Sequence, residues 1–126
     1  MKLLGIDYGR KKIGVAISEG QLVEPLMVLK IKSQKDILEK LCSLVKGKDV
    51  GKIVIGIPGG GMDKEIKEFG KLLQNESKTL VIFQDETLTT KDAQELSIKA
   101  GIKRLKRKEM EDAYSAALIL QSYLGY

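Results

Sequence analysis

Acidic residues stand at three places where the sequence predicts the ends of structural elements. Asp7 closes an apolar run near the start of the chain. Asp85 and Glu86 follow another such run, and Asp112 lies in the first turns of a predicted helix. Carboxylates gathered at one site repel one another. Two divalent cations about 3.5–4 Å apart would relieve this repulsion while holding the attacking water and the leaving oxygen of a phosphodiester. These acids therefore favour metal-dependent phosphodiester hydrolysis.

Each acid also has a simpler explanation when it is taken alone. Asp7 could be a turn residue, and Asp85 with Glu86 could form a solvated strand end. Asp112 could be favoured by the dipole at a helix start. Asp85 is a further candidate metal ligand, as is Glu109, which precedes Asp112 by three residues and could point the same way along a helix. The joint placement of the acids, rather than any one of them, indicates a site.

The residue types that are missing narrow the chemistry. Histidine is absent, and Cys42 is the single cysteine. This excludes serine–histidine and cysteine–histidine catalysis, as well as zinc sites made of histidines or several cysteines. Cys42 falls in an apolar helical pattern, which favours a small buried thiol over a nucleophile. Oxygen ligands suit Mg²⁺ or Mn²⁺. We therefore expect Asp7, Glu86 and Asp112 to bind such an ion, which would activate water without a covalent intermediate.

Basic residues flank the predicted acidic site. Lysines and arginines outnumber acids by 22 to 17, and the net charge is +5. One basic group follows Asp7 directly and consists of Arg10, Lys11 and Lys12. A second precedes Asp112 and consists of Lys103, Arg104, Lys106, Arg107 and Lys108. Such runs are often only solvated loops, but two of them beside a metal site favour binding of phosphates.

The composition limits how a nucleic acid would be recognised. Aromatic residues make up 5% of the chain and tryptophan is absent, so base stacking is not expected to dominate. We expect the partner to be a structured nucleic acid, either RNA or branched DNA, recognised through its backbone and shape.

The bulk numbers predict a single domain spanning residues 1–126. Hydrophobic residues are 43% and charged residues 31%, as in soluble globular domains. No apolar run is long enough to cross a membrane, and the stretch before Asp7 is too short for a secretory signal. We expect a cytoplasmic protein with no membrane contact, present as a monomer or a weak homodimer.

The spacing of apolar residues predicts the elements that must position these side chains. Five strands are expected, at residues 2–7, 13–18, 22–31, 52–57 and 79–84. Four helices are expected: from a cap at Ser33 to Gly47, around Ile66–Leu73 with Asp63 as the cap, from Thr89 or Thr90 to about Lys99, and from about Glu109 to Leu124.

This succession of elements predicts an α/β fold. A three-stranded meander followed by two crossovers gives a five-stranded mixed sheet of order 3-2-1-4-5 with helices on both faces. Ligands of such sheets collect outside the carboxyl ends of the strands. If the last helix packs across the sheet, Asp112 could meet Asp7 and Glu86 at one edge.

Four segments, in this order, carry a family pattern: Leu4–Ser18, Val54–Pro58, Asp85–Thr90 and Asp112–Leu124. They resemble the opening hairpin, the fourth-strand motif, the acidic motif and the terminal helix of the YqgF family of ribonuclease-H-like proteins. The resemblance covers nearly the whole chain. It implies a ribonuclease-H-like fold with Asp7, Glu86 and Asp112 as the catalytic acids. It also implies a nuclease that matures the precursor of 16S ribosomal RNA or, alternatively, a Holliday junction resolvase.

Three features depart from the family pattern. Thr87 stands where the family usually has an arginine, whose planar fork could bind a phosphate. Gly59–Gly61 replaces a more polar loop, and Glu111 stands where an apolar residue is common. These departures leave open a non-catalytic nucleic-acid-binding module. A phosphotransfer ATPase of the actin and sugar-kinase type is another alternative, because Asp7-Tyr8-Gly9 fits its first hairpin, although such proteins bind nucleotide between two domains.

Overall fold

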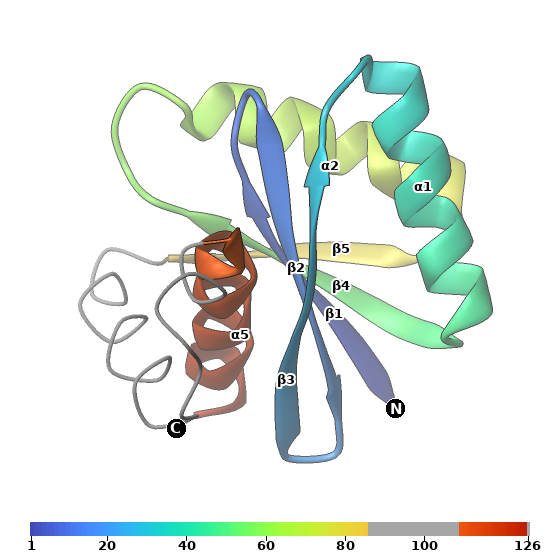
Figure 1. Cartoon of the computed structure of the whole chain (residues 1–126), viewed down its shortest axis with the longest axis vertical. Helices are drawn as coiled ribbons and strands as arrows, with labels where there is room; N and C mark the ends of the chain where they lie inside the picture. Colours follow the sequence, from blue (N-terminus) through green and yellow to red (C-terminus); the bar gives the residue numbers. More distant parts are fainter. Residues whose placement is uncertain (86–108, 126) are drawn as a thin grey trace.

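A mixed β-sheet organises the computed structural model of the chain, which describes residues 1–85 and 109–125 (Figure 1). The strands are β1 (Lys2–Tyr8), β2 (Lys12–Glu19), β3 (Leu22–Lys30), β4 (Val50–Ile57) and β5 (Leu80–Asp85). The helices of the described residues are α1 (Gln34–Gly47), α2 (Asp63–Ser77) and α5 (Glu111–Leu124). The predicted helix from Thr89 or Thr90 to about Lys99 lies outside the described residues.

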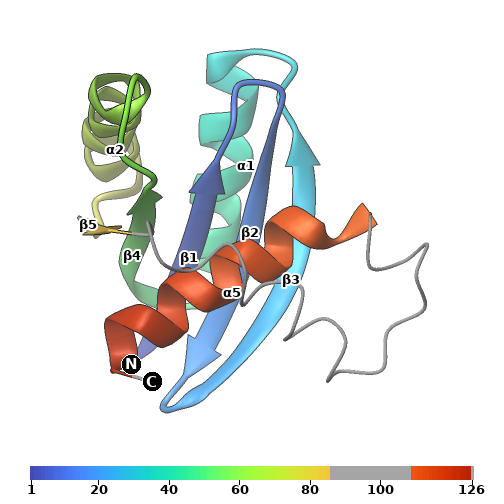
Figure 2. The same ribbon diagram turned by 90° about the vertical axis from the view of Figure 1, so that its left-hand side faces the viewer.

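The strand order is β3-β2-β1-β4-β5, which confirms the order predicted from the sequence. The first three strands form an antiparallel meander. The chain then crosses over through α1 to place β4 parallel to β1, and through α2 to place β5 parallel to β4. Helices α1 and α2 cover one face of the sheet, and α5 crosses the other face diagonally (Figure 2).

Alternation along the strands divides the core into two layers, one on each face of the sheet. In β1, Leu4 and Ile6 are buried against the α1–α2 layer. Leu3 belongs to the smaller layer under α5, which includes Ala116 and Leu120. Asp7 has the same parity as Leu3, so the alternation places it on the α5 face.

The helix starts agree with the sequence patterns in one case and depart from them in two. Ser33 caps α1, and its Oγ accepts a hydrogen bond of 3.0 Å from the Asp36 amide, as predicted. The prediction that Asp63 caps α2 is wrong, because Met62 is the N-cap and Asp63 is the first helical residue. A carboxylate in the first turn is still stabilised by the positive end of the helix dipole. Helix α5 begins at Glu111 rather than about Glu109.

Two glycines of the β1–β2 hairpin allow α5 to approach the sheet closely. A Cβ atom at Gly5 would lie 2.6 Å from Cγ of Leu120 and 2.8 Å from the carbonyl oxygen of Ala116. A Cβ atom at Gly14 would overlap the carbonyl group of Asp112. The first turn of α5 therefore rests on the backbone of β2, and any side chain larger than hydrogen at Gly14 would push it away.

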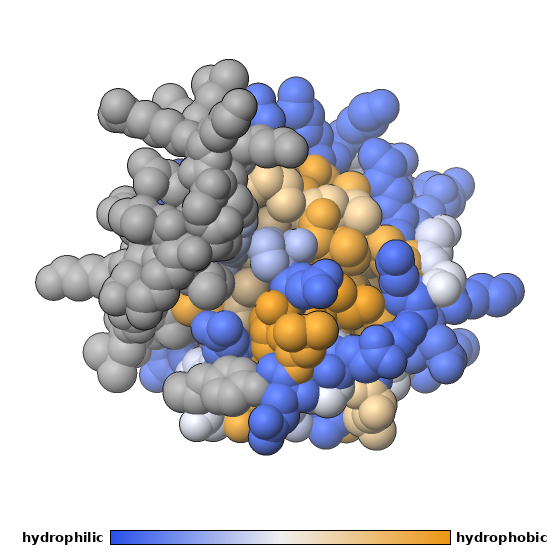
Figure 3. All heavy atoms as spheres, turned by 60° about the horizontal axis from the view of Figure 1, so that its bottom comes forward, coloured by the Kyte–Doolittle hydropathy of each residue, from blue (hydrophilic) through white to orange (hydrophobic). Residues whose placement is uncertain are grey.

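Exposed apolar side chains are few among the described residues. None of the helices described is both long and apolar enough to span a membrane. On the face shown in Figure 3, apolar side chains gather in the middle and hydrophilic ones lie along much of the edge. The most exposed large apolar side chains, Met1, Leu22 and Leu80, come from three separate parts of the sequence.

Candidate active site

An open surface pocket of about 310 Å³ lies where the end of β1 meets the start of α5. Its lining consists of Asp7, Tyr8, Gly9, Arg10, Lys11, Lys12 and Asp112. Gly14 explains this meeting, because it pairs with Asp7 across the β1–β2 ladder and also contacts the main chain of Asp112. The structure thus brings together two of the three predicted catalytic acids. The third, Glu86, lies outside the described residues.

Asp112 is partly withdrawn from solvent and lies beside a cation. Its Oδ2 is 3.3 Å from Nζ of Lys12, and the two side chains are 29% and 55% exposed. The same Oδ2 atom is buried and has no hydrogen-bond partner among the described residues. These two observations are compatible, because the contact is short enough for an ion pair but does not have the angles of a hydrogen bond. A buried anionic oxygen is costly unless a cation or donor compensates it.

The donors in the pocket suit a hard divalent cation. Asp7 and Asp112 offer carboxylate oxygens, the ligands that Mg²⁺ and Mn²⁺ prefer. The buried Oδ2 of Asp112 is an acceptor to which the described residues donate no hydrogen bond. Within residues 1–85 and 109–125, no group of three or more acidic or cysteine side chains is close enough to hold a metal ion. The described residues therefore offer two carboxylates in one pocket, fewer than the three acids predicted from the sequence.

The two further candidate ligands do not line this pocket. Asp85 ends β5 and is exposed. By alternation it shares the face of Phe83, which packs against the α1–α2 core, whereas Asp7 lies on the opposite face. Glu109 is exposed and precedes α5. Its role as a ligand stays a prediction.

The structure brings the first basic group to the acids, since Arg10, Lys11 and Lys12 all line the pocket. The second group, residues 103–108, lies outside the described residues. One further lysine was not predicted from the sequence. Lys30 ends β3 and pairs directly with Lys12 across the ladder. The predicted meander could have revealed this lysine, because the end of the third strand must lie opposite the start of the second.

Glu65, near the start of α2, is a second residue that the sequence did not single out. Its Oε2 accepts a hydrogen bond of 2.9 Å from the Tyr8 hydroxyl. Its Oε1 accepts one of 3.3 Å from Nε of Arg10. The Tyr8 ring also packs on Phe69, with 4.9 Å between ring centroids. These contacts tie the basic turn to α2 and restrict where the Arg10 guanidinium can lie. No local pattern in the sequence could reveal a contact of such long separation.

Tyr8 makes the stability of the protein sensitive to alkaline pH. Burial and the hydrogen bond to Glu65 raise the pKa of Tyr8 from its ordinary value to about 12. The folded protein thus holds this proton more tightly than the unfolded chain, in which the pKa is about 10. The stability that results is complete below about pH 10 and is lost as the pH rises towards 12. We expect the urea midpoint to fall more between about pH 9 and pH 11.5 in the parent than in Tyr8→Phe. Equal falls would contradict this assignment.

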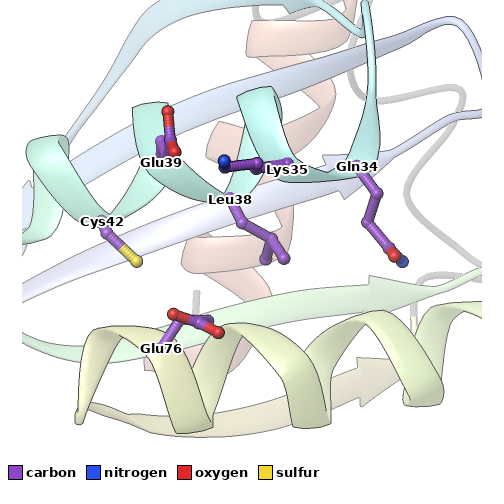
Figure 4. A pocket seen from close by; sticks show the side chains of 6 residues that line it. All are labelled: Gln34, Lys35, Leu38, Glu39, Cys42 and Glu76. Atoms are coloured by element: carbon purple, nitrogen blue, oxygen red, sulfur yellow. The ribbon is translucent and has the colours of Figure 1, made fainter.

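A larger pocket, of about 480 Å³, lies between α1 and α2 (Figure 4). None of the predicted catalytic acids lines it. Its lining includes Cys42, Glu39 and Glu76, and it lies on the face of the sheet that α1 and α2 cover (Figure 2). Burial, followed by the charge of Glu76, raises the pKa of the Cys42 thiol. The thiol is half-buried rather than fully buried, and a raised pKa disfavours the thiolate form that a nucleophile requires.

Comparisons with known proteins agree with the fold and with the sequence motifs. A protein of Syntrophus aciditrophicus is 39% identical over 98% of this chain and 88% of its own length. A protein of Thermoanaerobacter pseudethanolicus is 38% identical over 98% of this chain and 96% of its own length. Both are named as candidate pre-16S rRNA nucleases.

Solved structures confirm the ribonuclease-H-like fold. RuvC of T. thermophilus, solved in complex with a Holliday junction substrate, superposes with a TM-score of 0.68 at 17% identity, covering 98% of this chain and 94% of RuvC. The fowlpox virus resolvase, solved with Holliday junction DNA, superposes with a TM-score of 0.61 at 16% identity, covering the whole of both chains.

The family profile called RuvX, described as Holliday junction resolvase, matches residues 1–126. The identities with the two bacterial relatives extend over nearly all of the same residues. Sequence motifs, strand order and comparisons lead to one conclusion: the chain belongs to the RuvX family, also called YqgF.

Proposed function

We propose that this protein is a metal-dependent endonuclease that processes the precursor of 16S ribosomal RNA. The observation that carries the proposal is the pocket in which Asp7 and Asp112 lie beside three basic residues of the β1–β2 turn. Carboxylates that could hold metal and cations that could hold phosphate are thus within one site. The names of the two bacterial relatives support 16S precursor RNA as the substrate.

Three acids would hold the metal, namely Asp7, Asp112 and Glu86. When bound there, Mg²⁺ or Mn²⁺ would lower the pKa of a water molecule and stabilise the leaving oxygen of the phosphodiester. Asp7 would hold the metal ion in a fixed position, because it lies on a central strand that is paired on both sides. Asp112 is held by the close contact between α5 and Gly14.

The basic turn would bind the phosphate backbone. The guanidinium of Arg10 can present a fork to phosphate oxygens, and Glu65 already restricts its position. Lys11 lines the same pocket and adds a mobile point charge. Such contacts position a nucleic acid without reading its bases. The cytoplasm, where ribosomal RNA precursors are processed in bacteria, is the location that fits this role.

Resolution of Holliday junctions is the second candidate function. The fold similarity to two resolvases solved with junction DNA favours it. Residues that contact the backbone act on either kind of duplex, so the described part of the site favours neither substrate. A third outcome, binding without cleavage, would fit the absence of the family's arginine at Thr87.

One experiment separates these three functions. Purified protein is incubated with a labelled 16S precursor fragment and with a four-way DNA junction, each with Mg²⁺, Mn²⁺ or chelator. We expect cleavage of the RNA with either metal and none with chelator. Metal-dependent cleavage of the junction alone would assign the protein as a resolvase. Binding of either substrate without cleavage would assign it as a binding module. An Asp112→Asn preparation controls for contaminating nucleases.

We expect nucleic-acid binding to weaken steeply with added salt. Neutralising Lys106, Arg107 and Lys108 with glutamine should lower the slope of log affinity against log salt by about 0.7–0.9 for each phosphate that the protein no longer neutralises. Binding titrations at several salt concentrations measure this slope. The matched control replaces three exposed lysines of α1 and α2, namely Lys46, Lys67 and Lys71. A slope that changes equally in both variants would mean that the basic group does not bind phosphates specifically.

A further inference from the structure

Lys12 is the side chain whose position the proposed reaction leaves unexplained. It points at a carboxylate of the active site, with 3.3 Å between its Nζ and Oδ2 of Asp112, and not only at the solvent in which a phosphate would bind. That oxygen is buried, and no described donor makes a hydrogen bond to it. Among the described residues, the ammonium of Lys12 is therefore the cation that lies against Asp112.

The strand register explains why Lys12 reaches this oxygen. Alternation along β2 places Lys12, Gly14 and Ala16 on the face that α5 covers, and Ala16 is buried in the layer beneath α5. Because Gly14 has no side chain, the first turn of α5 lies directly on β2, two residues from Lys12. The packing of the two main chains thus brings Lys12 and Asp112 within reach of each other.

The neighbouring charges make an anionic partner for Lys12 favourable. Lys30 lies directly opposite Lys12 in the β2–β3 ladder, and like charges at such positions repel. Asp112 offsets this repulsion. The Lys12 side chain is 55% exposed, so it is free to leave Asp112 towards solvent or a phosphate. A pair with that exposure is weak, and a divalent ion can displace its lysine.

We propose that Lys12 is the resident counter-ion of Asp112, which keeps the metal-free site assembled and which a divalent metal ion must displace. The inference rests on the proposed metal site at Asp7 and Asp112. Lys12 is then a positioning residue: it lowers the affinity for metal while stabilising the empty site. Binding of metal frees its ammonium next to the place where the phosphate is to bind.

Calorimetric titration with MnCl₂, in the absence of nucleic acid, tests this inference. Lys12→Met keeps the apolar stem of the side chain and removes the charge. We expect this variant to bind Mn²⁺ about two- to five-fold more tightly than the parent, the range expected for a partly exposed ion pair. Mere structural damage would weaken metal binding. The matched control is Lys30→Met, which removes the same charge from the same face but leaves the partner of Asp112 in place.

Thermal unfolding gives a second, independent readout. With chelator, Lys12→Met should unfold at a lower temperature than the parent, because Oδ2 of Asp112 then loses its cation among the described residues. With saturating Mn²⁺ that difference should shrink, because the metal replaces the missing charge. Lys30→Met should not show this dependence on metal.

The possible failures are distinct. Equal or weaker Mn²⁺ binding by Lys12→Met, while the parent binds Mn²⁺ and Asp112→Asn does not, would overturn the counter-ion role and leave the proposed function intact. An effect of Lys30→Met as large as that of Lys12→Met would also overturn it in favour of general charge repulsion. If the parent binds no Mn²⁺, or Asp112→Asn binds it as the parent does, the metal site itself is refuted and the inference falls with it.

Discussion

Replacing Asp7 with asparagine should reduce metal-dependent cleavage by at least about 100-fold while leaving the fold intact. The substitution removes a charged metal ligand but nearly keeps the shape of the side chain. Stabilisation of a phosphodiester transition state by metal is worth several kcal/mol, so losing even part of it has a large effect on rate. Single-turnover cleavage with saturating protein measures the chemical step. Substrate binding should be kept or become tighter, because repulsion between the carboxylate and phosphate falls.

Asp49→Asn is the matched control for this variant. It makes the same change of charge in the turn between α1 and β4, away from the pocket. Asp49 is exposed and has a φ of 56°, a conformation that asparagine also tolerates. Its cleavage rate should equal that of the parent. Parental activity in Asp7→Asn, in a preparation free of host nucleases, would mean that the catalytic site lies elsewhere.

Gly14→Ala should damage both stability and activity. Its new methyl group would overlap the carbonyl of Asp112, so α5 must move away from β2. Overpacking of this kind costs about 1–3 kcal/mol in the free energy of unfolding. The same movement displaces the Asp112 carboxylate from Asp7, and a shift of about 1 Å in a reacting group can reduce the rate about 100-fold. Urea denaturation and single-turnover cleavage measure the two effects.

Gly47→Ala is the control for the added methyl group. Gly47 is the last residue of α1, and a Cβ atom built there has no heavy atom within 4 Å. Alanine at that position should leave the protein as stable as before, or more stable by about 0.5–1 kcal/mol. If Gly14→Ala unfolds at the parental urea concentration with parental activity, the close packing of α5 on β2 does not position Asp112.

Local patterns were sufficient to predict most of the fold. Alternating apolar residues predicted the three strands of the meander. The helices before the fourth and fifth strands predicted crossover connections, which place those strands parallel to their neighbours. The cap at Ser33 was predictable because a serine side chain acts on the amide three residues later. The prediction of Asp63 as a cap was wrong because an acid is favoured both at the cap and in the first turn, so a local pattern does not distinguish the two positions.

The details of the site depend on contacts that local patterns do not encode. The sequence suggested that Asp7 and Asp112 could meet, and they line one pocket. It did not reveal that Gly14 allows this meeting, because the contact depends on how closely α5 approaches the sheet. Glu65 was missed for a similar reason, since its partners Tyr8 and Arg10 lie on a distant strand and turn. The role of Glu86 stays a prediction.

The packing of α5 across the β1–β2 hairpin also bears on the order in which the protein folds. Asp7 and Asp112 lie near opposite ends of the described sequence, so their pocket closes only when a very long loop is closed. The entropy lost in closing long loops delays contacts of this kind relative to a hairpin or a helix. During refolding, the antiparallel strands should therefore form before the two acids meet. A chain caught between these stages would carry the basic turn without a complete acidic site, and it could hold an RNA that it cannot yet cut.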